Sequence, residues 1–156
     1  MKKALITGIT GQVGSQLADY ILNNTDYEVV GMMRWQEPLD NIYHLTDRIN
    51  KNDRISVYYA DLNDGMSIRR MIEEVRPDYI SHLAAQSYPK TSFNIPIETL
   101  QTNIIGTANL LKSSIKNKVK HNIIITTDKC YVNENKKLRF KENSKLGGDD
   151  PYSASK

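Results

Sequence analysis

The stretch Thr7-Gly8-Ile9-Thr10-Gly11-Gln12-Val13-Gly14 decides the fold of this chain. It joins a short apolar run, residues 4–7, to a segment whose apolar residues recur with helical spacing. Its glycines are spaced GxxGxxG. Gly8 can form a tight turn, Gly11 lets the backbone come close to a ligand, and Gly14 lets a helix pack closely against the preceding strand.

A turn of this kind leaves unpaired N–H groups at the positive end of a helix dipole. In βαβ units such groups bind the pyrophosphate of a dinucleotide. A glycine triplet can also be an ordinary turn, but its place at a strand–helix junction favours dinucleotide binding. We therefore expect a cofactor site that includes Gly8, Thr10, Gly11, Gln12, Val13 and Gly14.

The rest of the chain repeats this alternation. Strands are predicted at residues 4–7, 28–33, 55–59, 79–83 and 122–126, and their consecutive apolar residues suit a sheet buried on both faces. Three helical stripes lie between them: Val13, Leu17, Ala18, Ile21 and Leu22; Ile68, Met71, Ile72 and Val75; and Leu100, Ile104, Ala108, Leu111 and Ile115. The pattern predicts an α/β fold, a doubly wound Rossmann-type parallel sheet of three layers in the order 3-2-1-4-5.

Composition restricts the class of protein. The 156 residues have the length of one domain, and 39% hydrophobic with 25% charged residues exclude disorder. A net charge of +3 does not indicate nucleic acid, and no apolar run is long enough to cross a membrane. The single cysteine, Cys130, excludes an intrachain disulfide, so we expect a cytoplasmic protein. One cysteine and three scattered histidines predict no metal site.

Two segments read as irregular. Residues 34–53 contain Pro38 and a short helix around 41–49, and residues 129–150 form a long polar loop. We interpret the basic cluster of that loop as a solvated surface, although loops at the carboxyl ends of strands also bind ligands; it consists of Lys136, Lys137, Arg139 and Lys141.

The end of the second strand decides the coenzyme. Gly31-Met32-Met33-Arg34-Trp35 has no carboxylate until Glu37, and Arg34 can pair with a 2′-phosphate, which favours NADP over NAD. The alternative is that Arg34 is a surface residue. After the third strand, Asp61-Leu62 either meets the adenine amino group or caps the next helix.

Tyr152-Ser153-Ala154-Ser155-Lys156 places a tyrosine and a lysine on one face of a helix. Asp150 can cap this helix, with Pro151 in its first turn. A nearby ammonium lowers the pKa of a phenol, which can then accept a proton from a sugar hydroxyl as hydride leaves its carbon.

With these motifs the chain resembles the extended short-chain dehydrogenase/reductases, specifically the nucleotide-sugar 4,6-dehydratases. Residues 7–12 and Arg34 are similar to GDP-mannose 4,6-dehydratases. Residues 127–131, 146–148 and 150–152 are closer to CDP-glucose 4,6-dehydratases. The two halves point to different nucleotides, so the base of the nucleotide-sugar stays open.

The resemblance implies a role for each residue of the catalytic motifs. Thr127 would bind the 4-hydroxyl of the sugar and Tyr152 would deprotonate it, while Lys156 would bind the nicotinamide ribose. Asp128 would protonate the departing 6-hydroxyl. Lys129 occupies the position of a glutamate that removes the proton at carbon 5 in many dehydratases, and CDP-glucose dehydratases share the Asp-Lys pair.

The resemblance also implies that Leu83, Ala84 and Ala85 follow the cofactor, that Ser87 approaches the sugar and that Asn103 is structural. His82, at the end of a strand, reads as a core histidine rather than a catalyst. His44 and His121 lack metal-ligand spacing, and we expect Cys130 to be inert.

Residues 1–156 match the N-terminal half of the family, whose members continue into a domain that binds the nucleotide-sugar. We expect the 156-residue chain alone to be inactive and the full-length protein to be a homo-oligomer. Two alternatives stay open: a nucleotide-sugar reductase or 4-epimerase of the same superfamily, and a non-catalytic dinucleotide-binding module.

Overall fold

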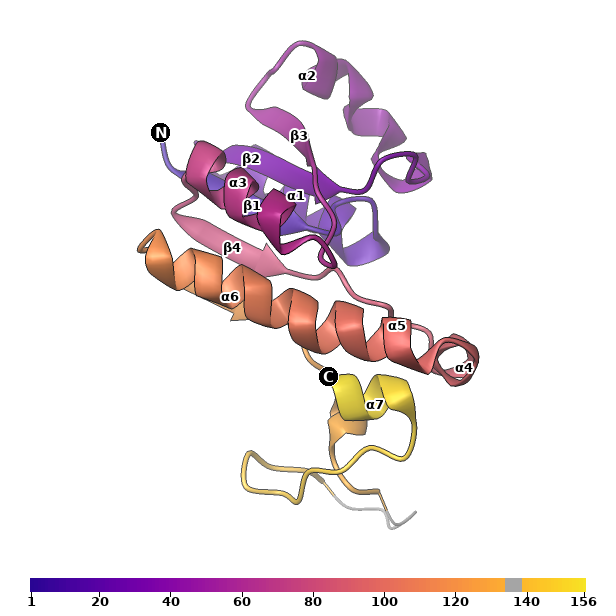
Figure 1. Cartoon of the computed structure of the whole chain (residues 1–156). Helices are drawn as coiled ribbons and strands as arrows, with labels where there is room; N and C mark the ends of the chain where they lie inside the picture. Colours follow the sequence, from indigo (N-terminus) through magenta and orange to yellow (C-terminus); the bar gives the residue numbers. More distant parts are fainter. Residues whose placement is uncertain (134–138) are drawn as a thin grey trace.

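The fold is built on five parallel strands in the order β3-β2-β1-β4-β5 (Figure 1). The computed structural model describes residues 1–133 and 139–156. The strands are β1 (Lys3–Thr7), β2 (Glu28–Met33), β3 (Ile55–Tyr59), β4 (Tyr79–His82) and β5 (His121–Ile124). The predicted strand order is confirmed, and the first and last residues predicted for each strand differ from the observed ones by at most two positions. Strand order reverses between β1 and β4, so their carboxyl ends form the crevice in which such sheets bind ligands.

Two hydrophobic cores cover the sheet, which makes the predicted three layers. Alternate residues of β1 enter different cores: Ile6 packs with α1 (Gln12–Asn24), and Leu5 packs with α3 (Gly65–Val75) and α6 (Gly106–Lys116). The core that contains Ile6 also includes residues of the 3-10 helix η1 (Asp40–Leu45), which leads into α2 (Thr46–Asn50). These two short elements confirm the helix predicted around residues 41–49.

The remaining helices gather at the carboxyl edge of the sheet. They are α4 (Pro89–Asn94), α5 (Pro96–Leu100), a π-helical turn η2 (Gln101–Ile105), the 3-10 turn η3 (Asp128–Cys130) and α7 (Pro151–Ser155). Helix α7 packs against both α4 and α5, next to the C-terminus (Figure 1). None of the helices in the described ranges is both long and apolar enough to cross a bilayer.

Two of the three predicted helical stripes differ from the observed buried faces. The stripe of α3 is buried as predicted, but Val13 at the start of α1 is 63% exposed. The third stripe is wrong, because Ile104 in η2 and Ile115 on α6 are 45% and 75% exposed. The buried residues of α6 are Leu110 and three small residues, Gly106, Ser113 and Ser114. The small residues allow close packing: a Cβ on Gly106 would lie 2.7 Å from the Cβ of Leu62.

Coverage of the sheet also differs at its edge. Strand β5 lies at the end of the sheet, and Ile123 is 59% exposed, so this strand is not buried on both faces as the sequence predicts. Within the described residues 125–133 and 139–150, the segment after β5 is mostly irregular, as predicted, and Tyr131 and Leu146 form an antiparallel bridge. Of the predicted basic cluster, Arg139 and Lys141 are exposed as expected, and Lys136 and Lys137 lie outside the described residues.

Gly31 in β2 positions the loop that carries the first glycine. A Cβ at this position would lie 2.3 Å from Cδ1 of Ile9, whose side chain is fully buried. We expect Gly31→Ala to lower the free energy of unfolding by about 1–3 kcal/mol, since extra atoms in a packed core force neighbours to shift. Urea titration measures this loss. Ile9→Val removes Cδ1, the nearest of three Ile9 atoms that the added Cβ would meet, so the double variant should lose somewhat less than the sum of the two single losses.

Candidate functional site

The GxxGxxG turn forms a tight backbone loop at the carboxyl end of β1. Gly8 has φ +71°, a conformation that favours glycine, and its N–H donates to the Met32 carbonyl at 3.1 Å. The Gly11 N–H donates back to the Gly8 carbonyl at 3.0 Å. A Cβ on Gly14 would lie 2.3 Å from the Gly8 carbonyl oxygen. The first and third glycines are therefore required by backbone contacts that cannot give way.

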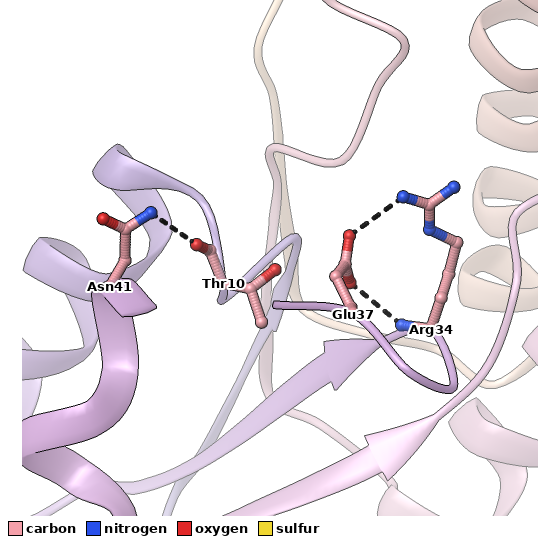
Figure 2. Close-up of polar contacts among 4 residues, drawn as sticks. All are labelled: Thr10, Arg34, Glu37 and Asn41. Carbon is pink, nitrogen blue, oxygen red and sulfur yellow. Dashed lines mark hydrogen bonds and ion pairs between the residues drawn. The ribbon is translucent and has the colours of Figure 1, made fainter. Parts of the chain in front are cut away.

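The amino end of α1 is open. Gly11 is the N-cap residue, no side chain caps the helix, and the first turn has no acidic residue. Gly11, Gln12 and Val13 are all exposed there. The Thr10 carbonyl accepts a hydrogen bond from the Asn41 side chain at 2.8 Å, which fixes the loop against η1 (Figure 2). The loop thus presents N–H groups and a positive dipole end to an anion.

The turn after β4 is joined to this loop by the hydroxyl of Thr7. Thr7 Oγ1 accepts the N–H groups of Leu83 and Ala84, both at 3.1 Å. The Ala84 backbone lies 3.0 Å from where a Cβ on Gly8 would stand. The half-buried residues Leu83, Ala84 and Ala85 therefore lie beside the glycine loop, where the resemblance places them.

His82 supports this junction from inside the protein. Its Nδ1 lies 2.8 Å from Thr7 Oγ1 and its Nε2 lies 3.0 Å from Thr107 Oγ1. Because Thr7 Oγ1 already accepts two N–H groups, we assign its proton to a bond with Nδ1, which makes Nε2–H the donor to Thr107. Burial, and to a smaller extent the charge of Lys156, lower the pKa of His82 to about 4. The ring is therefore neutral at pH 7, as expected for a core histidine.

The end of β2 carries an ion pair that the sequence pattern does not predict. Glu37 folds back so that its carboxylate accepts the Arg34 backbone N–H at 3.0 Å and the Arg34 guanidinium at 3.1 Å (Figure 2). A carboxylate is thus present where the spacing of the sequence predicted none. The sequence did contain a signal for this pair. Glu37 is only three residues after Arg34, so a tight turn can bring its carboxylate back to the end of the strand.

Beside this pair lies a cavity of about 480 Å³ between the ends of β2 and β3, lined by Arg34, Glu37, Tyr59, Asp61, Asp64 and Ser67 among others. Helix α3 is capped by Asp64, whose side chain accepts the Met66 N–H at 2.9 Å. Asp61 is not the cap, and its carboxylate accepts the Asn63 N–H at 2.8 Å. Leu62 is buried in the core, so its side chain does not line this cavity.

The Tyr-x-x-x-Lys segment forms α7, as predicted. Asp150 caps the helix by accepting the Ser153 N–H at 2.9 Å, and Pro151 is its first residue. The Tyr152 N–H donates to the buried Ser92 hydroxyl of α4 at 3.2 Å. These contacts fix the helix that carries the tyrosine.

Asn103 connects α7 with the turn after β4. Its side-chain oxygen accepts the Gln86 N–H at 2.9 Å, and its Nδ2 donates to the Gln86 carbonyl at 3.0 Å. The same Nδ2 lies 2.7 Å from Ser155 Oγ. This pattern gives Asn103 the structural role that the resemblance implies. Ser92 and Ser155 had no signal in the sequence, because both bonds join distant segments.

The proposed acid and base residues lie against α7. Helix α7 packs on η3, and Lys156 Nζ donates to the Ile125 carbonyl at 2.7 Å. Partial burial lowers the pKa of Lys156. Thr127 Oγ1 accepts the Lys129 N–H and donates to Asp128 Oδ1, both at 3.3 Å.

Other candidate residues occupy the surroundings. Asp128 and Lys129 are exposed and Cys130 is half-buried. Ser87 is exposed just before α4. Gly148, part of the segment 146–148 that carries the resemblance to CDP-glucose 4,6-dehydratases, lies directly against α7, since a Cβ there would be 2.5 Å from the Ala154 nitrogen. The structure therefore brings residues 127–129 and α7 together at the carboxyl edge of the sheet.

A GxxGxxG turn at the first crossover and a Tyr-x-x-x-Lys helix against the end of the fifth strand define a dinucleotide-binding domain of the short-chain dehydrogenase/reductase class. The family described as GDP-mannose 4,6 dehydratase matches residues 5–156. The chain belongs to that family.

Two curated relatives illustrate the match. The CDP-glucose 4,6-dehydratase of Salmonella typhimurium is 34% identical over 158 residues, which cover 99% of this chain and 42% of the relative. The GDP-mannose 4,6-dehydratase of Yersinia enterocolitica is 39% identical over 126 residues, 78% of this chain and 33% of the relative. The chain thus spans less than half the length of either relative.

Solved structures show the same fold. The UDP-glucose 4-epimerase of Thermotoga maritima aligns with a TM-score of 0.83 and 29% identity, over 98% of this chain and 47% of that one. The UDP-glucose 4-epimerase of Thermus thermophilus, solved as a complex with NAD, aligns with a TM-score of 0.79 and 25% identity, over 98% and 47% of the two chains.

Gly14→Ala tests the glycine loop. The added Cβ meets backbone atoms of Gly8 and Ile9 at 2.3 and 2.9 Å, so we expect coenzyme affinity to fall at least about tenfold. Calorimetric titration with NADPH and NADH measures the affinity, and circular dichroism checks the fold. Gly65→Ala is the matched control, because there the Cβ meets the Asn109 side chain at 3.2 Å. Equal affinities in both variants would contradict the loop assignment.

The neutral state of His82 predicts how stability depends on pH. Its pKa is about 4 when folded and 6.5 when unfolded, so the unfolded chain binds more protons between these values. Its contribution is complete above pH 6.5 and falls by about 3 kcal/mol as the pH approaches 4. Urea midpoints between pH 7 and 4.5 should change less in His82→Asn than in the wild type. His121→Asn, at an exposed position, should keep the wild-type slope.

Proposed function

We propose that this chain is the dinucleotide-binding N-terminal part of an NADP-dependent nucleotide-sugar 4,6-dehydratase, a lyase. The reaction converts an NDP-hexose into an NDP-4-keto-6-deoxyhexose by internal hydride transfer. The observation that carries the proposal is the packing of α7, which contains Tyr152 and is followed by Lys156, against the turn that holds Thr127, Asp128 and Lys129. Membership of the dehydratase family supports it.

The fit of a dinucleotide rests on the glycine loop. Its backbone leaves no room for a Cβ at Gly8 or Gly14, and the first turn of α1 lacks both a capping side chain and an acidic residue. Such a loop suits a pyrophosphate. A solved neighbour, the Thermus thermophilus epimerase, holds NAD, which supports a nicotinamide dinucleotide here. Arg34 at the end of β2 supports NADP as the coenzyme.

In this mechanism the phenolate of Tyr152 accepts the proton of the sugar 4-hydroxyl, and Thr127 binds that hydroxyl. A nicotinamide dinucleotide held by the glycine loop would supply the hydride acceptor for carbon 4 and the hydride donor for carbon 6. Lys156 directly follows α7, four residues after Tyr152, and would bind the ribose of the nicotinamide. Lys129 removes the proton at carbon 5, and Asp128 protonates the 6-hydroxyl so that it leaves as water. Lys129 then returns a proton to carbon 5 when carbon 6 is reduced, which completes the 4-keto-6-deoxy product.

The substrate and the rest of the protein follow from the relatives. Their names give GDP-mannose and CDP-glucose as substrates, so we infer a nucleotide-sugar here, with a role in polysaccharide biosynthesis. Because the chain spans less than half of either relative, we propose that a further domain binds the sugar nucleotide and that residues 1–156 alone do not turn over. The free thiol of Cys130 supports a cytoplasmic location.

We also propose that the full-length protein is a homo-oligomer. Apolar side chains are exposed on three successive elements: Ile97 of α5, Ile104 of η2 and Ile115 of α6. Exposed apolar side chains of this kind are available to an interface between subunits. Light scattering on the full-length gene product measures the mass.

A 4-epimerase is the second candidate, because solved neighbours of the chain are UDP-glucose 4-epimerases. The Asp128-Lys129 pair after Thr127 favours dehydration, since an epimerase needs no acid for a departing 6-hydroxyl. Product analysis separates the two: a dehydratase releases a 4-keto-6-deoxy sugar. A non-catalytic dinucleotide-binding module would bind coenzyme and give neither product.

Tyr152→Phe tests the reaction in the full-length gene product with GDP-mannose and CDP-glucose. We expect kcat to fall about 100- to 10,000-fold, because proton transfer loses its acceptor. Tyr20→Phe, at an exposed position on α1, is the matched control and should keep wild-type turnover. Asp128→Asn should slow the loss of water. Unchanged turnover in Tyr152→Phe, or an epimerised product from the wild type, would overturn the proposal.

A further inference from the structure

The cavity at the end of β2 has an unusual balance of charge for a site that receives a phosphate. Among its lining residues are three carboxylates, Glu37, Asp61 and Asp64, and one cation, Arg34. The Glu37 side chain is 19% exposed, whereas that of Arg34 is 64% exposed. The carboxylate therefore lies on the protein side of the ion pair.

Glu37 uses both of its oxygens at this point. Oε2 accepts the backbone N–H of Arg34, and Oε1 accepts its guanidinium (Figure 2). The backbone bond fixes the carboxylate relative to the end of β2. An incoming 2′-phosphate must share Arg34 with this fixed negative charge, and it also meets direct repulsion from Glu37.

We propose that Glu37 determines coenzyme specificity by holding the Arg34 guanidinium and lowering the preference for NADP over NAD. The inference rests on the proposed coenzyme site. A ribose with a free 2′-hydroxyl brings no charge and can donate to a carboxylate, so Glu37 is compatible with NAD. Arg34 favours the phosphate and Glu37 opposes it, which makes the pair the element that sets the ratio of the two affinities.

Glu37→Gln tests the inference, because it removes the charge and keeps the size. We expect the ratio of Kd for NADH to Kd for NADPH to rise about tenfold, mainly through tighter NADPH binding. Trp35 is the single tryptophan of the chain and lines the cavity, so its fluorescence reports the titrations. Glu37→Ser is a second variant that also removes the charge, and thermal melting checks that both are folded.

The matched control is Glu73→Gln. Glu73 pairs with Arg69 at 2.8 Å on α3 and does not line this cavity, so its loss should leave the affinity ratio unchanged. If both coenzymes bind and neither Glu37 variant changes the ratio by more than twofold, the role of Glu37 is overturned and the coenzyme site stands. If the wild type binds neither coenzyme, the proposed function fails as well.

Discussion

The hydroxyl of Thr7 is the contact on which the site depends. Thr7 is the last residue of β1, and its hydroxyl accepts two backbone N–H groups from the turn after β4 and hydrogen-bonds the ring of His82. β1 and β4 are the neighbours at which strand order reverses, so this one oxygen joins the two halves of the crevice. Because the His82 ring is buried and neutral at pH 7, this junction adds no charge to the crevice.

Around this junction, backbone contacts rather than side chains shape the coenzyme loop. The glycines at positions 8 and 14 let the β1–α1 turn fold onto itself and onto Ala84. Helix α7 is positioned differently, through hydrogen bonds with the side chains of Ser92 and Asn103. A loop shaped by backbone contacts and a short helix held by side-chain hydrogen bonds therefore lie at one edge of the sheet.

Local patterns predicted the sheet well. The strand order and the cap of α7 by Asp150 follow from runs of a few residues, and the structure confirms both. The predictions were wrong where tertiary contacts override the pattern. The predicted apolar stripe that includes Ile115 of α6 faces solvent, because small residues such as Gly106 pack against the core instead. Glu37 returns to the end of β2 through a loop whose course the sequence does not specify.

The π-helical turn Gln101–Ile105 lies within one continuous helical segment, Pro96–Lys116, which contacts both the hydrophobic core and α7. A π turn adds a residue, which rotates everything beyond it by about 100° relative to a regular helix. Leu110 can then face the core while Asn103 faces Gln86 and α7. Deleting a single residue here would restore a regular helix and turn one of these two side chains away from its partner. The extra residue therefore sets the rotation of the segment that packs on the core relative to the segment that contacts α7.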